Sequence, residues 1–139
     1  DFQDAVYGPI TYDIASLMRD AFLSWDEDFC LDITIRYWDK ARKAGAPVVE
    51  IHTGKYADAS SVPEQAHELA RIQHAVAHGD ALGLQVNAGH GLNYHNVQPI
   101  VAIPKICELN IGHAIISEAL FIGLEQAVRK MKALLIPQP

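Results

Sequence analysis

Two Gly-His pairs are the residues of this sequence best suited to chemistry. Gly89-His90 and Gly112-His113 each follow a strand-like run and open a turn toward a helix. Glycine allows the backbone to approach a ligand closely, and a histidine beside it can exchange a proton near neutral pH. We therefore interpret His90 as a candidate acid-base residue. The alternative is a hydrogen-bonded turn histidine.

An anion site is predicted at Gly112-His113. Free amides at the start of a helix, reinforced by the helix dipole, attract phosphate, and they need only the local turn to form. The alternative is that Gly112 provides a tight turn and that His113 makes a polar contact at the start of the helix.

Strands and helices that alternate after residue 45 must position these pairs. β-Branched and apolar runs between breakers predict strands at Val48–His52, 84–87 and 108–111. Between the strands we expect a polar loop after the first, a helix with a capping box from Ser61 to Gly83, and a short helix or turn at 96–103. A long last helix, 113–135, is expected to bury Ile116, Leu120, Leu124, Ala127 and Met131.

The first part of the chain is predicted to be helical. A loop at 1–9 precedes a helix at 11–24, and a second helix, capped by Asp26, ends at Gly45. The fold class is therefore α/β: two N-terminal helices followed by three strand-helix units of a parallel, partial TIM-barrel-like sheet. We expect segments 1–45 and 46–139 to form one compact unit.

Three strands do not close a barrel, which typically needs about 250 residues. The sheet edge and an inner face that we expect to be apolar must then be covered by the N-terminal helices, by another copy or by a partner. We therefore expect a homo-oligomer. The tail 137–139 is expected to fray.

Composition limits the function classes. The chain has 139 residues, 50% of them hydrophobic, and a net charge of −6, which disfavours nucleic-acid binding and favours a basic protein partner. Without an apolar run of membrane-spanning length or a secretory signal, a cytoplasmic protein without membrane contact is expected. Cys30 and Cys107 occur in contexts typical of buried residues, so no disulfide framework is predicted.

From about Gly45 to Leu135 the chain resembles the C-terminal part of the pyridoxine 5'-phosphate synthases, (β/α)8-barrel enzymes of vitamin B6 biosynthesis. The run LQVNAGHGLNYHNVQPIVAIPKICELNIGHAII, residues 84–116, carries the likeness. The resemblance implies that His90 donates a proton in the ring closure between 1-deoxyxylulose 5-phosphate and an amino-oxopropyl phosphate. It also implies that a substrate phosphate contacts Gly91, Gly112 and His113.

Glu50 matches a family position implicated in stabilising the transition state, and an inward carboxylate there would orient His90 or a cationic intermediate. The bare pattern instead indicates a pairing or solvent-side residue. The synthases also use a histidine and a glutamate from their first strands, and nothing before Gly45 supplies them. We therefore expect weak binding of phosphate or a phosphorylated small molecule, no cofactor, and no efficient catalysis.

Residues 1 to about 45 resemble the tail of an aminoglycoside-phosphotransferase-like sugar kinase, beginning at Asp1-Phe2. Asp1 would be its magnesium ligand, a vestigial one because the nucleotide loop is absent. With a join near 44–47, the chain resembles a recombined or designed chimera. Two alternatives stay open: an acidic, antitoxin-like binding or inhibitory module, and a synthase whose missing half comes from another chain.

Two side-chain clusters have simpler explanations. His67, His74 and His78 share a helical stripe, which is more typical of a solvated face than of a metal site. The second cluster is aromatic, and we expect it to pack in the core or to form an interface hot spot: Trp25, Phe29, Tyr37 and Trp38.

Overall fold

The computed structural model describes residues 27–136. Its elements are α2 (Glu27–Lys43), β1 (Val48–His52), α3 (Gly54–Asp58), α4 (Val62–Ala81), β2 (Gln85–Gly89), α5 (Val97–Val101), β3 (Ile106–Asn110), α6 (His113–Ile122) and α7 (Leu124–Leu134). The predicted helix at 11–24, Asp1, Trp25 and the tail 137–139 lie outside the described residues.

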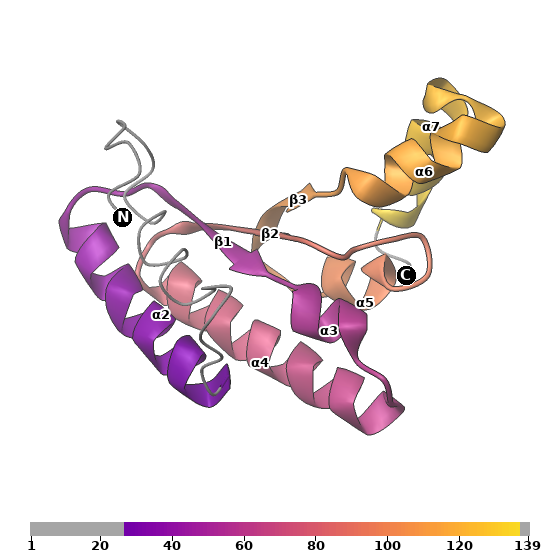
Figure 1. Ribbon diagram of the computed structural model, residues 1–139. Coiled ribbons are helices and arrows are strands. Elements are labelled where there is room, and N and C mark those ends of the chain that lie inside the picture. Colours follow the sequence, from indigo (N-terminus) through magenta and orange to yellow (C-terminus); the bar gives the residue numbers. More distant parts are fainter. Residues whose placement is uncertain (1–26, 137–139) are drawn as a thin grey trace, which may run out of the picture.

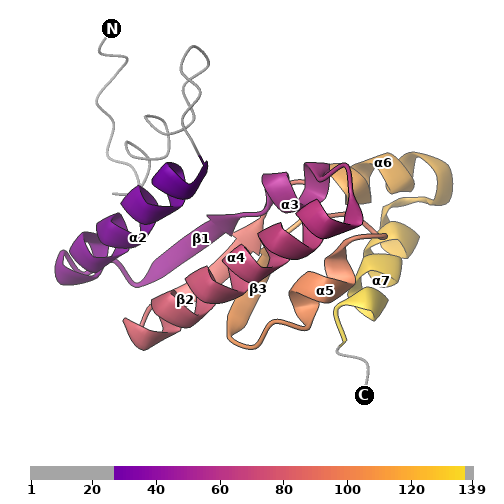
Figure 2. The ribbon, with the colours of Figure 1, turned by 90° about the horizontal axis from the view of Figure 1, so that it is seen from below.

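The three strands form one parallel sheet in the order β1-β2-β3, which confirms the predicted α/β class. Helices connect the strands, and α2 and α4 lie on the same side of the sheet in two views (Figure 1, Figure 2). The strand at 48–52 was predicted at its observed bounds, and the other two were predicted within two residues of theirs.

The core lies between the sheet and α4. Val49 and Ile51 of β1 and Val86 and Ala88 of β2 are buried in one cluster with residues of α4. At Gly79 the helix lies so close to the sheet that an added Cβ atom would be 2.6 Å from Cγ2 of Val86. The apolar half of each strand thus faces its helix.

The other face of the sheet is polar. Alternation places Glu50 and His52 of β1 beside Asn87 of β2 and Glu108 and Asn110 of β3, because Glu50 pairs with Asn87 and Asn87 with Glu108. Our expectation of an apolar inner face was therefore wrong. The helix α4 buries the hydrophobic residues of β1 and β2, so the polar residues of these strands lie on the open face.

The predicted N-cap at the start of α4 is confirmed, but the Glu64 side chain bonds a different residue than a capping box predicts. The hydroxyl of Ser61 accepts a hydrogen bond from the amide of Glu64. The Glu64 carboxylate accepts from the amide of Ser60, one residue before the cap, rather than from the cap residue itself. The preceding segment, expected to be a polar loop, contains α3 and the fully buried Tyr56.

The last helix is broken where one helix was predicted. Gly123 has φ 81°, which separates α6 from α7, and Lys130 of α7 reaches Glu118 of α6 at 2.6 Å. α7 turns back against α6, and the buried residues of this pair of helices lie in α7 alone. Ala127 and Met131 are buried as expected; the predictions for Ile116, Leu120 and Leu124 were wrong, since they are 58%, 81% and 56% exposed.

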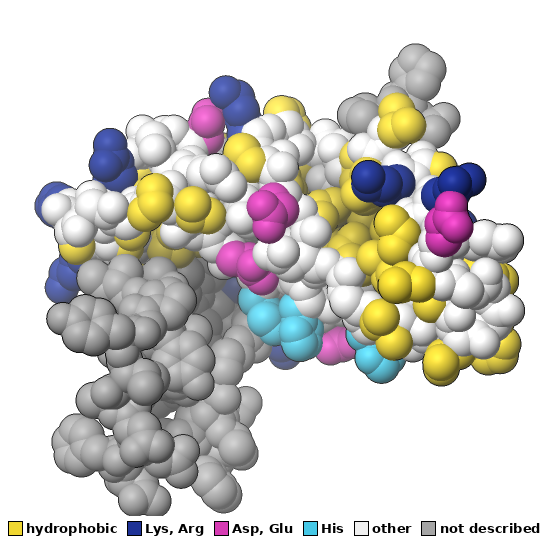
Figure 3. All heavy atoms as spheres, turned by 90° about the horizontal axis from the view of Figure 1, so that it is seen from above, with side chains coloured by type: hydrophobic (Ala, Val, Ile, Leu, Met, Phe, Trp, Pro, Cys, Tyr) yellow, Lys and Arg dark blue, Asp and Glu magenta, His cyan; other side chains and the backbone are white. Residues whose placement is uncertain are grey.

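The helix α6 projects from the body of the molecule, and hydrophobic side chains gather on that part of the surface (Figure 1, Figure 3). No helix within residues 27–136 has the length and apolar character needed to cross a membrane.

Candidate active site

The carboxyl ends of the three strands meet at one edge of the sheet. The register aligns His52 of β1 with Gly89 of β2, and Gly89 with Asn110 of β3. His90 and Gly112-His113 follow the ends of β2 and β3, so both Gly-His pairs belong to this edge. Parallel α/β proteins place their reacting groups at such an edge.

His90 has a backbone conformation that non-glycine residues rarely adopt, with φ 82°. Thr53, fully buried after β1, holds it there. The Thr53 hydroxyl donates to the carbonyl oxygens of Gly89 and His90, at 2.8 and 2.6 Å, and its amide donates to Gly89 at 2.7 Å. A buried side chain of β1 thus fixes the turn that presents the imidazole.

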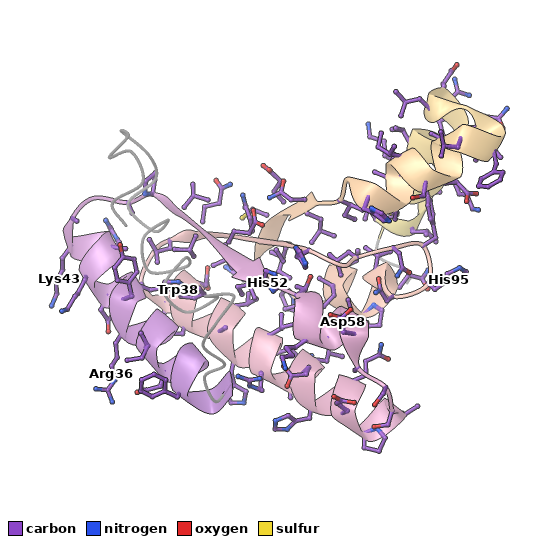
Figure 4. The ribbon with its side chains drawn as sticks, in the orientation of Figure 1. Arg36, Trp38, Lys43, His52, Asp58 and His95 are labelled. Atoms are coloured by element: carbon purple, nitrogen blue, oxygen red, sulfur yellow. The ribbon has the colours of Figure 1, made fainter. Side chains whose placement is uncertain are left out.

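His52 contacts His90 directly. The centroids of the two imidazole rings are 4.1 Å apart and their planes are 26° from parallel. Both side chains are exposed, and His52 lies where β1 passes into α3 (Figure 4). The amide of Gly54 donates to Nδ1 of His52 at 3.2 Å.

Glu50 lies on the polar face of the sheet, as its alternation with buried neighbours requires. Its carboxylate accepts a hydrogen bond from the side-chain amide of Asn110, across β2. Gly89 makes this contact feasible, because a Cβ atom at Gly89 would lie 2.9 Å from Oε1 of Glu50. The predicted role of orienting His90 has no contact to support it; the described partner of Glu50 is Asn110.

Asn96 organises the loop after His90. Its side-chain amide donates to the Gly91 carbonyl, its side-chain oxygen accepts from the Asn93 amide, and its carbonyl accepts from the Tyr56 hydroxyl. Burial raises the pKa of Tyr56, which keeps this hydroxyl a donor. Gly91 has φ 74° and lies against Ala57, so only glycine fits there.

The second pair forms the predicted strand, turn and helix. Both residues are exposed, α6 begins at His113, and no side chain caps its first amides. Gly112 has open space around it, so a ligand can approach its backbone. The phosphate-binding roles of Gly91, Gly112 and His113 stay predictions.

The histidine stripe divides into two environments. His67 and His74 are exposed, as a solvated helix face requires, whereas His78 is half-buried and stacks on Trp38 with ring centroids 6.5 Å apart. Within residues 27–136 no three His, Cys, Asp or Glu side chains are grouped to hold a metal ion. Trp38 packs in the core as predicted, while Phe29 is 45% exposed and Cys107, predicted to be buried, is exposed at a β-bulge.

Three residues of this edge were not predicted from the sequence: His52, Thr53 and Asn96. A signal existed for the first two, because His52 ends and Thr53 directly follows a strand whose carboxyl end was already expected to carry the site. No local pattern marks Asn96, whose role depends on contacts with Gly91 and Tyr56.

Adjacent parallel strands joined by helices, with glycine turns at their carboxyl ends, are consistent with part of a (β/α)-barrel. The profile of the family described as pyridoxal phosphate biosynthesis protein PdxJ matches residues 29–136, and the chain belongs to this family. It is similar to the pyridoxine 5'-phosphate synthase of Idiomarina loihiensis, with 54% identity over 97 residues that cover 70% of this chain and 40% of the relative.

The family match begins well before the expected boundary near Gly45 and includes α2 from Phe29 onward. It runs through the join that we placed near residues 44–47. The match therefore offers no support for a join at that point, and no finding supports the kinase-like resemblance of residues 1 to about 45.

Proposed function

We propose that this chain carries the phosphate-binding and proton-donating part of a pyridoxine 5'-phosphate synthase site. The observation that supports it most is the shared register, which aligns the strand ends that precede His90 and the Gly112 turn, while Glu50 bonds Asn110 on the polar face of the sheet. In this proposal the amides of Gly112 and His113 bind a substrate phosphate. A protonated His90 donates to a substrate oxygen, and Glu50 stabilises a neighbouring positive charge.

Residues 27–136 form three strands, whereas a closed barrel has eight, and the chain spans 40% of the length of its curated relative. General acid-base catalysis needs a second group within reach of the same substrate. We therefore propose that the chain alone binds phosphate weakly and that efficient turnover requires further strand-helix units.

Phosphate titration into isotope-labelled protein tests the binding part. We expect localised shifts of the amide signals of Gly112, His113 and Ala114, joined by Gly91, with roughly millimolar affinity, or about 4 kcal/mol. Chloride at matched ionic strength is the control. Shifts spread evenly over the chain, or equal shifts with chloride, would contradict a phosphate site.

Turnover is tested by adding the N-terminal strand-helix units of a family relative. With 1-deoxyxylulose 5-phosphate and the amino-oxopropyl phosphate present, the mixture should form pyridoxine 5'-phosphate, and His90→Ala should abolish it. The chain alone should form none. Product from the unmixed chain would contradict the need for further units, and persistence of activity in His90→Ala would remove His90 as the proton donor.

A further inference from the structure

We propose that His52 is a positioning residue that sets the orientation of the His90 imidazole; this inference rests on the proposed function, in which His90 is the proton donor. The two rings stack with centroids 4.1 Å apart, and they reach each other from the ends of adjacent strands.

His90 needs such a contact because its backbone clamp does not determine its side-chain torsions. The Thr53 hydroxyl and amide donate to backbone carbonyl oxygens of Gly89 and His90, and these bonds fix the backbone rather than the imidazole. An exposed side chain on a fixed backbone still rotates among staggered rotamers. A ring stacked against the imidazole restricts the rotamers that His90 can adopt and keeps its donor nitrogens at the carboxyl ends of the strands.

The orientation of His52 is itself determined by Gly54. The Gly54 amide donates to Nδ1 of His52, and because an N–H group only donates, this nitrogen carries no proton. The ring proton of His52 therefore lies on Nε2.

Gly54 also defines the space that His52 occupies. A Cβ atom at this position would lie 2.5 Å from Cε1 of His52 and 3.1 Å from Cδ2 of His90. Gly54 begins α3 and does not have a positive φ, so alanine suits its backbone. Gly54→Ala thus displaces the His52 ring while keeping both imidazoles in the chain.

The test compares three variants of the full chain by NMR: His52→Ala removes the ring, His52→Phe keeps a flat ring, and Gly54→Ala displaces it. In the parent chain we expect ring-to-ring Overhauser contacts, His90 ring protons shifted by the neighbouring ring current, and the Nε2–H tautomer of His52. His52→Ala and Gly54→Ala should remove the ring-current shift, and His52→Phe should preserve it. His74→Ala, at an exposed histidine of α4, is the control.

Unchanged His90 ring signals in both His52→Ala and Gly54→Ala, with intact β2 amide signals, would overturn the proposal. If His52→Ala does not fold, Gly54→Ala decides alone. In the complemented barrel, His52→Ala should lower kcat about 10- to 100-fold with a smaller effect on KM, and His52→Phe should restore part of it.

The two proposals can fail separately. If complementation gives no product, the proposed function is contradicted. The NMR signals of the His90 ring still test whether the two imidazoles stack. Product formation that is equal in the parent and in His52→Ala would remove the positioning role and leave the synthase function in place.

Discussion

His90 holds a backbone conformation that usually belongs to glycine, and it does so beside a fully buried threonine. A non-glycine residue with positive φ costs on the order of 1 kcal/mol or more, so the surrounding contacts must stabilise it. The hydroxyl of Thr53 supplies these contacts by donating to the carbonyl oxygens of Gly89 and His90. One of the two described non-glycine residues with positive φ is thus the residue proposed to do chemistry; the other is Lys105.

Replacement of Thr53 by valine tests this clamp. Valine keeps the shape of the side chain but cannot donate to Gly89 and His90, and it leaves both carbonyls with fewer partners. We expect the free energy of unfolding to fall by about 1–3 kcal/mol, measured by urea denaturation. The exposed Ser117→Ala is the control, with a change within about 0.5 kcal/mol. Equal stability of Thr53→Val and the parent would contradict the clamp.

Gly89 is a second residue whose environment allows only a small side chain. In Gly89→Ala the added Cβ atom meets Oε1 of Glu50 at 2.9 Å and the Asn110 backbone oxygen at 3.0 Å. We expect a loss of about 1–3 kcal/mol from overpacking, seen in the same denaturation assay. Gly112→Ala, which meets no atom within 4 Å, should lose less. A larger loss for Gly112→Ala would show that crowding at Gly89 is not the cause.

At the scale of elements, sequence patterns predicted what depends on neighbours along the chain. The strand 48–52 and the N-cap at Ser61 follow from β-branched residues and a capping pattern, and both are present. The break at Gly123 was missed because the apolar spacing continues across it. The α3 helix was missed because its stability comes from burying Tyr56 against the loop at Asn96, 40 residues away.

The same holds for the candidate site. The positions of His90 and Gly112 at strand ends were predictable from Gly-His after a strand-like run. The contacts that shape the edge, from Thr53 to Gly89 and from Glu50 to Asn110, join residues 36 and 60 positions apart. Only strand register, which no local pattern specifies, brings them together.

The start of α4 gives a pH-dependent prediction. The amide and then the hydroxyl of Ser60 lower the pKa of Glu64 below its usual 4.5. A lowered folded-state pKa means that the charged carboxylate stabilises the fold above pH 4.5 and that this contribution is lost as pH falls through the lower value. We expect Glu64→Gln to lower the melting temperature at neutral pH, with a difference that shrinks in acid.

Glu125→Gln is the matched control, because Glu125 also lies in a first helical turn but pairs with Arg129 at the surface. A melting-temperature difference for Glu64→Gln that is constant from neutral to acidic pH would show that its charge is not the stabilising feature.

For the whole molecule, α6 is the element least covered by the rest of the described chain. None of its residues is buried, and Leu120 and Phe121 are 81% and 87% exposed. Exposed apolar residues on one helix favour self-association. We therefore expect dimers or larger species at micromolar concentration, and Leu120→Lys should shift the population toward monomer in sedimentation experiments.

Val62→Lys is the control, since Val62 is also 81% exposed but lies at the start of α4. It should leave the sedimentation profile unchanged. A parent chain that is monomeric across the micromolar range would contradict self-association, and equal effects of the two lysine variants would show that added charge, rather than α6, controls it.

The two-sided sheet has a consequence for how such chains change in evolution. The helical side of the sheet carries Val49, Ile51, Val86 and Ala88. The other side carries Glu50 and Asn87. Because α4 covers both strands, a gene segment that encodes β1, α4 and β2 together carries its own hydrophobic cover. Such a segment can be duplicated or transferred to another gene without exposing apolar strand residues, and its polar face is ready to join the interior of whichever barrel receives it.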